Sequence, residues 1–311
     1  MGEESAIVNL PVIDLAAPDR LVTAATLRQA CIEVGFFYIV NHGVDKDLLN
    51  RVFEESNKFF SVPLEEKTRL NLKEFRGYTA LYSENVDPSS TKGDSKESFY
   101  IGPLHNEVCN LNQWPSEELL PSWRPTIEAY HRQILSAGKN LLSLLALTLN
   151  LDENFFDKVG AVDPLMPFLR LIHYPGDLRC DNEEVVGAGA HSDYGMITLL
   201  ATDGVPGLQV CREKDRQPRI WEDVPHIEGA IIVNIGDMTE RWTNRLFRST
   251  LHRVVPTGQE RFSVACFLDP PHNFSVECLD TCCSESNPPR FPGIRYIDYI
   301  QESYRNIFEA K

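Results

Sequence analysis

Basic side chains are scarce in this sequence. Lys and Arg number 30 against 45 Asp and Glu, which gives a formal net charge of −15 at pH 7 and a pI of about 5.0. An acidic surface repels phosphate backbones and anionic lipid headgroups, so we expect neither nucleic acid nor a membrane as a partner.

Long apolar runs are absent as well. The longest, 141–151, is interrupted by Ser143, Thr148 and Asn150 and is too short to span a bilayer. The first ten residues, MGEESAIVNL, lack both the basic start and the apolar core of a secretory signal peptide. No other targeting motif is recognisable, so we expect a cytoplasmic protein.

Closely paired cysteines are also lacking. The eight cysteines form no CxxC motif, and most are scattered, as expected of free thiols in a reducing compartment. Only Cys278, Cys282 and Cys283 lie close together in the sequence. Three sulfurs without an evident fourth ligand make a poor structural zinc site, so a surface loop is the simpler interpretation.

The first half of the chain alternates short β-rich runs with helical patterns. We expect a strand at 11–15, a helix at 25–34, a β-rich run at 35–44, an amphipathic helix at 46–60 and a long helix from about Pro125 to Asn150. The polar residues 83–98, rich in Ser, Asp and Lys, predict a mobile loop.

After about residue 165 the pattern changes to short β-rich runs separated by Gly, Pro and Asp, which is typical of an antiparallel sandwich or barrel. The expected strands are 168–174, 195–202, 208–211, 230–235, 247–255 and 262–268, followed by an aromatic amphipathic helix at 295–308. The predicted fold is therefore mainly β, a double-stranded β-helix (jelly-roll) core with a helical N-terminal region and a long supporting helix. We divide the chain into an N-terminal region (1–110), linking helices (111–162) and the jelly roll with its C-terminal helix (163–311), all in one compact unit.

His191 and Asp193 stand two residues apart in the run GAHSDYGMITLL, so on a strand both side chains would share one face. A second histidine, His252, lies in the later run STLHRVV. Two imidazoles and one carboxylate suit Fe(II) with one side of the octahedron left open. Zinc is the alternative, although zinc sites that activate water often carry their histidines on one helix.

The His-x-Asp spacing is weak evidence by itself. Similar pairs occur at His105-x-Glu107 and His226-x-Glu228, in polar, turn-like contexts that predict solvated surface groups. A core hydrogen bond between the first histidine and its aspartate, and an ordinary strand histidine in STLHRVV, remain alternatives to a metal site.

Arg261 and Ser263 also stand two residues apart, on a predicted strand whose same face carries Ala265 and Phe267. A guanidinium buried there needs a partner, and the neighbouring Glu260 points to the opposite face. The partner is either an acidic residue of another strand or the carboxylate of a ligand, held by the planar guanidinium and the hydroxyl.

Taken in order, these motifs resemble the plant-type iron(II)/2-oxoglutarate-dependent dioxygenases, a family that includes isopenicillin N synthase-like enzymes. The resemblance runs through PVIDL, GFFYIVNHGV, FFSVPLEEK and RGYT, then RLIHYP, HSDYGMITLL, GLQV, IIVNIGD, STLHRVV and RFSVACFLDPP. It covers nearly the whole chain and is loosely closest to hyoscyamine 6-hydroxylase-like members.

The resemblance implies a role for each site residue. The iron ligands would be His191, Asp193 and His252, and the distal carboxylate of 2-oxoglutarate would be bound by Arg261, Ser263 and Tyr174. The chain departs from the family pattern at Ile172 and His173, where many relatives have Asn-Tyr. Because Ile172 cannot donate a hydrogen bond, the positioning of the cosubstrate is the point that this departure affects.

The resemblance further implies oxidation, most often hydroxylation, of a small molecule. Fe(II), O₂ and 2-oxoglutarate would take part, 2-oxoglutarate would be decarboxylated to succinate and CO₂, and ascorbate would serve as reductant in vitro. Candidate substrate contacts are Tyr78, Phe99, Phe168 and Phe267, each of which could instead be a core aromatic residue. An aromatic pocket suits an alkaloid, a hormone or a phenylpropanoid, bound by a monomer.

Two further functions remain open at this stage. One is a same-fold oxidase that does not use 2-oxoglutarate, as in the ethylene-forming oxidases. The other is a non-catalytic small-molecule binding protein, against which the complete set of candidate metal ligands argues.

Overall fold

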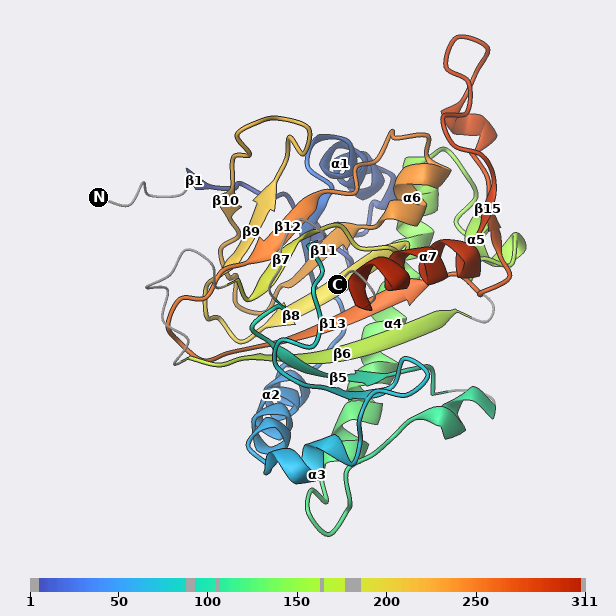
Figure 1. The fold of residues 1–311 in the computed structure, drawn as a ribbon. Helices are drawn as coiled ribbons and strands as arrows, with labels where there is room; N and C mark the ends of the chain where they lie inside the picture. The colour runs from blue at the N-terminus through green and yellow to red at the C-terminus, as the bar shows by residue number, and fades with distance from the viewer. Residues whose placement is uncertain (1–5, 88–92, 105–106, 163–164, 177–185, 309–311) are drawn as a thin grey trace.

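The computed structural model describes residues 6–87, 93–104, 107–162, 165–176 and 186–308. Two β-sheets dominate it (Figure 1). The larger sheet has the strand order β2 (Val12–Asp14), β3 (Phe36–Val40), β11 (Ile231–Ile235), β8 (Ile197–Thr202), β13 (Arg261–Asp269), β6 (Met166–Tyr174), β5 (Glu97–Ile101) and β4 (Gly77–Thr79). The smaller has the order β1 (Ala6–Ile7), β10 (Glu222–Asp223), β9 (Leu208–Cys211), β12 (Leu251–Val254) and β7 (Ala188–His191).

Pairing is antiparallel except at two edges, where β1 runs parallel to β10 and β2 runs parallel to β3. A short hairpin of β14 (Ser275–Val276) and β15 (Ile294–Arg295) precedes the last helix. These features confirm the predicted jelly-roll core.

Some helices cover the outer face of the larger sheet, while others lie elsewhere in the molecule. The helices are α1 (Arg20–Glu33), α2 (Lys46–Phe60), α3 (Leu64–Thr68), α4 (Trp123–Thr148), α5 (Phe155–Lys158), α6 (Asp237–Trp242) and α7 (Tyr296–Phe308), with 3-10 turns at Glu107–Leu111 and Asp280–Cys282. The long helix α4 lies behind the sheet in Figure 1 and contacts α1, α2 and β13. Gly138 of α4 allows this approach, because a Cβ there would lie 2.2 Å from Cδ1 of Leu268.

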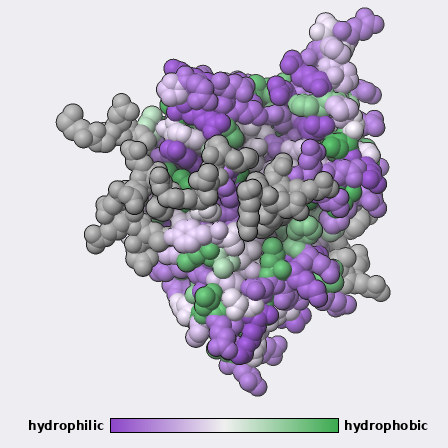
Figure 2. Space-filling model, in the orientation of Figure 1, coloured by the Kyte–Doolittle hydropathy of each residue, from purple (hydrophilic) through white to green (hydrophobic). Residues whose placement is uncertain are grey.

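Strand alternation divides the interior into two apolar cores. In β13, Phe262 and Val264 belong to the core beneath the helices, whereas Ser263 and Ala265 face the space between the two sheets. The same alternation in β6, β8 and β11 builds a cavity between the sheets. Hydrophilic residues cover most of the face seen in Figure 2, as expected of a chain with 24% charged residues.

Most predicted elements are present with shifted ends. The helix at 46–60 is confirmed as α2, the long helix begins at Trp123 and ends at Thr148, and the first helix begins at Arg20, five residues before the predicted start. The strand predicted at 247–255 is shorter, because pairing begins only at Leu251.

The prediction of a mobile polar loop at 83–98 is wrong for much of the segment. Glu84 and residues 94–98 are buried, and β5 begins at Glu97. Their polar groups are buried in pairs: Lys96 Nζ contacts carboxylate oxygens of both Asp94 and Glu84. Residues 88–92 lie outside the described residues.

Candidate active site

Three side chains meet in the cavity between the sheets. His191 at the end of β7 pairs across the sheet with His252 of β12, and their ring centroids are 4.3 Å apart. Oδ1 of Asp193 lies 3.7 Å from Nε2 of His191 and 3.6 Å from Nε2 of His252. Within the described ranges this is the one group of three or more His, Cys, Asp or Glu residues arranged to hold a metal ion.

Asp193 reaches this position from a turn and not from a strand. Strand β7 ends at His191, so the prediction that both residues share a strand face is wrong. The chain leaves the sheet after His191, and the backbone N–H of Asp237 at the start of α6 donates to the carbonyl of Asp193 at 2.8 Å. This contact holds the turn that directs the carboxylate toward both imidazoles.

Hydrogen bonds orient each potential ligand. Nδ1 of His191 donates to the carbonyl of Gly189 at 2.7 Å, and Nδ1 of His252 to that of Thr250 at 3.1 Å, which leaves both Nε2 atoms free to coordinate. Oδ2 of Asp193 accepts hydrogen bonds from Thr198 Oγ1 at 2.5 Å and Asn234 Nδ2 at 2.7 Å. Oδ1 is therefore the oxygen presented to a metal.

Electrostatics favour the coordinating forms of His191 and Asp193 near neutral pH. Burial and the neighbouring His252 lower the pKa of His191 to about 4, so its imidazole is neutral. Burial acts to raise the pKa of Asp193, but the electrostatic influence of His252 and His191 and two hydrogen bonds outweigh it and hold this pKa below the usual range. Two imidazoles and one carboxylate suit Fe(II).

Arg261 and Ser263 lie on β13 in a second part of the cavity, about 580 Å³ in volume, whose lining also includes His252 and Asp193. Nε of Arg261 donates to the carbonyl of Val205 at 3.2 Å. Nη1 of Arg261 and Oγ of Ser263 are buried and have no hydrogen-bond partner among the described residues. The ring of Tyr174 lies 5.0 Å from the guanidinium carbon. These groups form a site suited to a carboxylate.

The departures from the family pattern at residues 172 and 173 have separate consequences. Ile172 faces the cavity and lines it with an apolar side chain. His173 faces the opposite side, where Nδ1 contacts Glu97 and Nε2 contacts Glu260, each at 2.8 Å, and its ring stacks on Phe262. The predicted direction of Glu260, away from Arg261, agrees with this contact.

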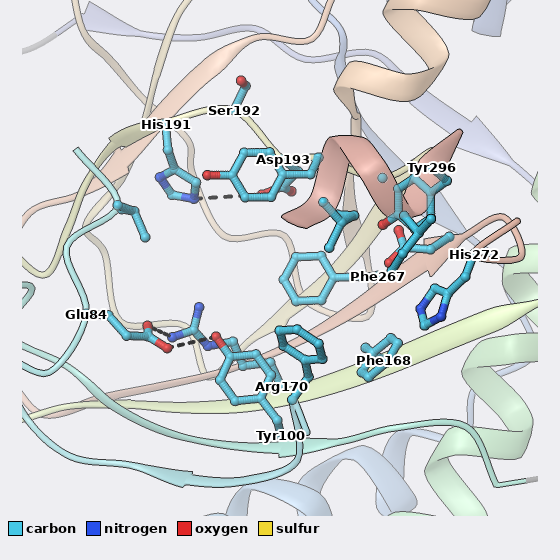
Figure 3. Close-up of a pocket in the computed structure, with 17 residues that line it drawn as sticks. Glu84, Tyr100, Phe168, Arg170, His191, Ser192, Asp193, Phe267, His272 and Tyr296 are labelled. Carbon is cyan, nitrogen blue, oxygen red and sulfur yellow. Dashed lines mark hydrogen bonds and ion pairs between the residues drawn. The ribbon is translucent and has the colours of Figure 1, made fainter. Parts of the chain in front are cut away.

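A larger opening of about 960 Å³ also borders the candidate metal ligands His191 and Asp193 (Figure 3). Phe168 and Phe267 line it, as predicted for substrate contacts. Tyr78 and Phe99 do not. Phe99 packs against Phe59 and Trp123 in the core beneath the sheet, and Tyr78 donates to the buried carboxylate of Glu97.

The prediction for Phe99 was wrong by one residue along β5. Successive side chains of a strand face opposite sides, so Tyr100 lines the cavity where Phe99 does not. Sequence reasoning also missed the carboxylate of Asp269 and three residues of α7, namely Tyr296, Ile297 and Ile300. The alternation of β5 could have revealed Tyr100, but nothing in the sequence placed α7 against the cavity.

The weaker candidates stay outside this site. His226 and Glu228 are exposed, as predicted, and His105 lies outside the described residues. Among the described cysteines no disulfide is formed, and Cys282 is buried while Cys278 and Cys283 are partly exposed. None of the described helices is both long and apolar enough to cross a membrane.

A jelly roll with two histidines, an aspartate and a carboxylate-binding pocket between its sheets has the architecture of a non-haem iron oxygenase. Comparison with known proteins specifies the family. Residues 10–117 match the family described as non-haem dioxygenase in morphine synthesis N-terminal, and residues 166–270 match the 2OG-Fe(II) oxygenase superfamily. The chain belongs to the 2OG-Fe(II) oxygenase superfamily.

Similar proteins cover almost the whole chain. Kihadalactone A synthase LFS of Citrus sinensis is 40% identical over 98% of this chain and 94% of its own length. Azadirone synthase LFS of Melia azedarach is 38% identical over 98% and 95%. A full-length Neurospora crassa protein, whose crystal structure was solved in complex with alpha-KG, has a TM-score of 0.84 at 32% identity, covering 97% of this chain and 99% of that one. JOX2, solved in complex with 2OG, Fe and JA, has a TM-score of 0.84 at 29% identity, covering 96% and 86%.

These comparisons establish the chemistry. The protein is a plant-type oxygenase that uses Fe(II) and 2-oxoglutarate to oxidise a small molecule. The family assignment made from the sequence motifs is confirmed.

Proposed function

We propose that His191, Asp193 and His252 hold the Fe(II), and that Arg261, Ser263 and Tyr174 bind the distal carboxylate of 2-oxoglutarate. The observation that carries this assignment is the pair of buried polar atoms, Arg261 Nη1 and Ser263 Oγ, for which the described residues supply no partner. They lie in the cavity that the metal-binding side chains also line, so a dicarboxylate could reach from the metal to Arg261.

The reaction we propose is hydroxylation of a C–H bond. Bound Fe(II), together with 2-oxoglutarate and O₂, supplies the oxidising chemistry. The side chains of the protein position the substrate and exclude water. Phe168 and Phe267 hold the substrate beside the metal, while Leu200, Leu208 and Val254 exclude water around the cosubstrate.

The substrate we propose is a plant specialised metabolite. Support comes from the two relatives at 40% and 38% identity, which are named for the synthesis of kihadalactone A and azadirone. The cavity is bordered by aromatic and aliphatic side chains, which suits a largely apolar molecule. We further propose that the protein acts as a monomer in the cytoplasm, without nucleic acid or membrane, which light scattering of the purified chain and imaging of a tagged chain would test.

One experiment tests the assignment of the metal ligands. In His252→Ala, succinate release from 2-oxoglutarate is expected to be lost during a screen of plant metabolites, while circular dichroism stays that of the wild type. His226→Ala, which removes an exposed histidine, is the matched control and should keep its activity. Wild-type turnover by His252→Ala would contradict the assignment.

A further inference from the structure

The cavity beside the metal-binding side chains is mainly apolar but contains one guanidinium, that of Arg170 on β6. In Figure 3 this side chain lies on the cavity wall opposite His191 and Asp193, with Phe168 and Phe267 between it and the α7 side. A substrate reaching from the metal across the cavity would therefore meet Arg170.

Neighbouring side chains hold the Arg170 guanidinium in one orientation. Its Nη2 donates to a carboxylate oxygen of Glu84, and Nε and Nη2 both contact Ser98 Oγ, at 3.1 and 3.0 Å. Its flat face lies 4.5 Å from the ring of Tyr100, whose hydroxyl donates to the other oxygen of Glu84 at 3.0 Å. None of these contacts uses Nη1, and in Figure 3 the guanidinium extends from the Glu84 contact toward the open space.

The ion pair with Glu84 is almost fully buried. Arg170 is 9% exposed and Glu84 5% exposed, so solvent does little to screen the two charges from each other. Glu84 therefore cancels most of the positive charge that Arg170 would otherwise present to a ligand. The hydrogen-bonding capacity of Nη1 remains.

Among the described residues, Lys96 Nζ also lies 3.4 Å from Oε2 of Glu84, but this ammonium is itself paired with the buried carboxylate of Asp94. Besides the metal-binding Asp193, the lining carries the carboxyls of Glu84 and Asp269 and no second Arg or Lys. The guanidinium of Arg76 lies 5.4 Å from the ring of Phe168 and is not part of the lining. A carboxylate entering this cavity would lose its hydration without gaining an uncompensated positive partner.

We propose that the Glu84–Arg170 pair makes the cavity selective for an electrically neutral substrate. Arg170 Nη1 would donate a hydrogen bond to a hydroxyl or carbonyl oxygen of that substrate, and Glu84 would act against acids of the same shape. This inference rests on the proposed function, because it places the reacting C–H bond beside the metal held by His191, Asp193 and His252.

Binding to the full chain tests the proposal without turnover. The protein is first loaded with Mn(II), which is redox-silent, and with saturating 2-oxoglutarate, so that the site at Arg261 is filled. Two probes of matched shape, 2-acetylnaphthalene and 2-naphthoate, are then titrated by calorimetry. We expect the ketone to bind at least about tenfold more tightly than the carboxylate, a difference of about 1.4 kcal/mol.

Variants of the pair separate charge from shape. Glu84→Gln leaves Arg170 without its buried counter-charge, so the preference should shift by about tenfold or more toward 2-naphthoate. The double variant Glu84→Gln/Arg170→Gln removes both charges and should again exclude 2-naphthoate. Glu65→Gln, which removes a carboxylate on α3 whose side chain is 82% exposed, should keep the wild-type ratio.

Two results would overturn the proposal. One is wild-type protein that binds 2-naphthoate as tightly as the ketone. The other is folded Glu84→Gln with an unchanged ratio. If Glu84→Gln does not fold, the wild-type comparison and the double variant decide. Failure of Mn(II) or 2-oxoglutarate to bind in the loading step would instead count against the proposed function, so the two failures are distinguishable.

Discussion

The carboxylate of Asp193 shows how single residues prepare this site. It is buried, and its Oδ2 accepts hydrogen bonds from Thr198 and Asn234, so only Oδ1 faces the two histidines. Such outer contacts fix a ligand's orientation before the metal arrives and commonly change metal affinity by about tenfold or more.

Replacing Thr198 by Val should therefore weaken metal binding. The isosteric change removes the donor at 2.5 Å and lets the Asp193 carboxylate rotate, so the dissociation constant of Mn(II) should rise about tenfold. Anaerobic titration followed by electron paramagnetic resonance measures it. Thr202→Val, on the same strand but bonded to the exposed His226, is the matched control. An unchanged affinity in Thr198→Val would show that Asn234 alone suffices.

The guanidinium of Arg261 permits a prediction about the cosubstrate. In Arg261→Lys the charge remains but the planar pair of donors is lost, so 2-oxoglutarate affinity should fall at least about tenfold while Mn(II) affinity changes less than about twofold. Calorimetric titration of each ligand tests this, with the exposed Arg216→Lys as control. A parallel loss of metal affinity would indicate general damage to the cavity.

At the residue level, the sequence predicted cavity-lining positions best where the chemistry of a residue was unusual for its surroundings. His252 and Arg261 are polar groups on apolar strands, which identified them without a structure. Tyr78 and Phe99 were less informative, because an aromatic residue on a strand fits either a core or a pocket. The pairing of Glu84 with Arg170 joins residues 86 positions apart, and neither sequence neighbourhood indicates it.

At the scale of elements, a buried polar cluster joins the helical region to the sheet. Nζ of Lys67 in α3 contacts Glu97 of β5 and the carbonyl of Phe60, both at 2.8 Å. Glu97 also accepts from Tyr78, and Nδ1 of His173 lies 2.8 Å from it. Removal of one partner from a buried cluster leaves an uncompensated charge, which costs more than the loss of a surface pair.

We accordingly expect Lys67→Met to lower the free energy of unfolding by at least about 2 kcal/mol. Urea denaturation measures the change. Lys158→Met removes a lysine whose side chain is 62% exposed and which pairs with the similarly exposed Asp152, so it should cost clearly less than Lys67→Met. Equal losses in both variants would mean that the buried cluster adds nothing beyond a surface pair.

Secondary-structure elements were predicted best where the apolar residues repeat at helical spacing over many residues. Helix α2 was predicted with its observed ends, because apolar residues recur at helical spacing through most of its fifteen residues and Asp45 caps the first turn. Strand β5 was missed because its first residues, Glu97 and Ser98, are polar. Their burial depends on Lys67 and Arg170, which are distant in sequence, so local pattern could not reveal the strand.

At the scale of the whole molecule, the two sheets enclose one functional interior with two ends. Arg261 lies at the end proposed for the cosubstrate, and Arg170 borders both this end and the part proposed for the substrate, beside the proposed metal ligands His191 and Asp193. Arg261 Nη1 has no hydrogen-bond partner among the described residues, whereas the positive charge of Arg170 is compensated by the carboxylate of Glu84. This difference lets one cavity accept a dicarboxylate at one end and, as proposed, a neutral molecule at the other.

The compensation at Arg170 also links the stability of the whole fold to pH. Burial acts to raise the pKa of Glu84, but Arg170 and Lys96 outweigh it and lower this pKa from 4.5 to about 2. Because the folded-state pKa lies below the unfolded one, the carboxylate contributes stability above about pH 4.5, and this contribution is lost as pH falls toward 2. A shift of this size corresponds to on the order of 3 kcal/mol.

Unfolding free energies measured in urea at pH 6, 4.5 and 3 should therefore decline more steeply for the wild type than for Glu84→Gln. The variant carries no group at this position that must be protonated on acidification, so its curve lacks this contribution although its stability at pH 6 is lower. Glu65→Gln, exposed on α3, should retain the wild-type slope. Parallel curves for the wild type and Glu84→Gln would mean that other carboxylates carry the acid sensitivity, and that the Glu84–Arg170 pair does not hold residues of the 83–98 segment against the larger sheet as an ionised pair.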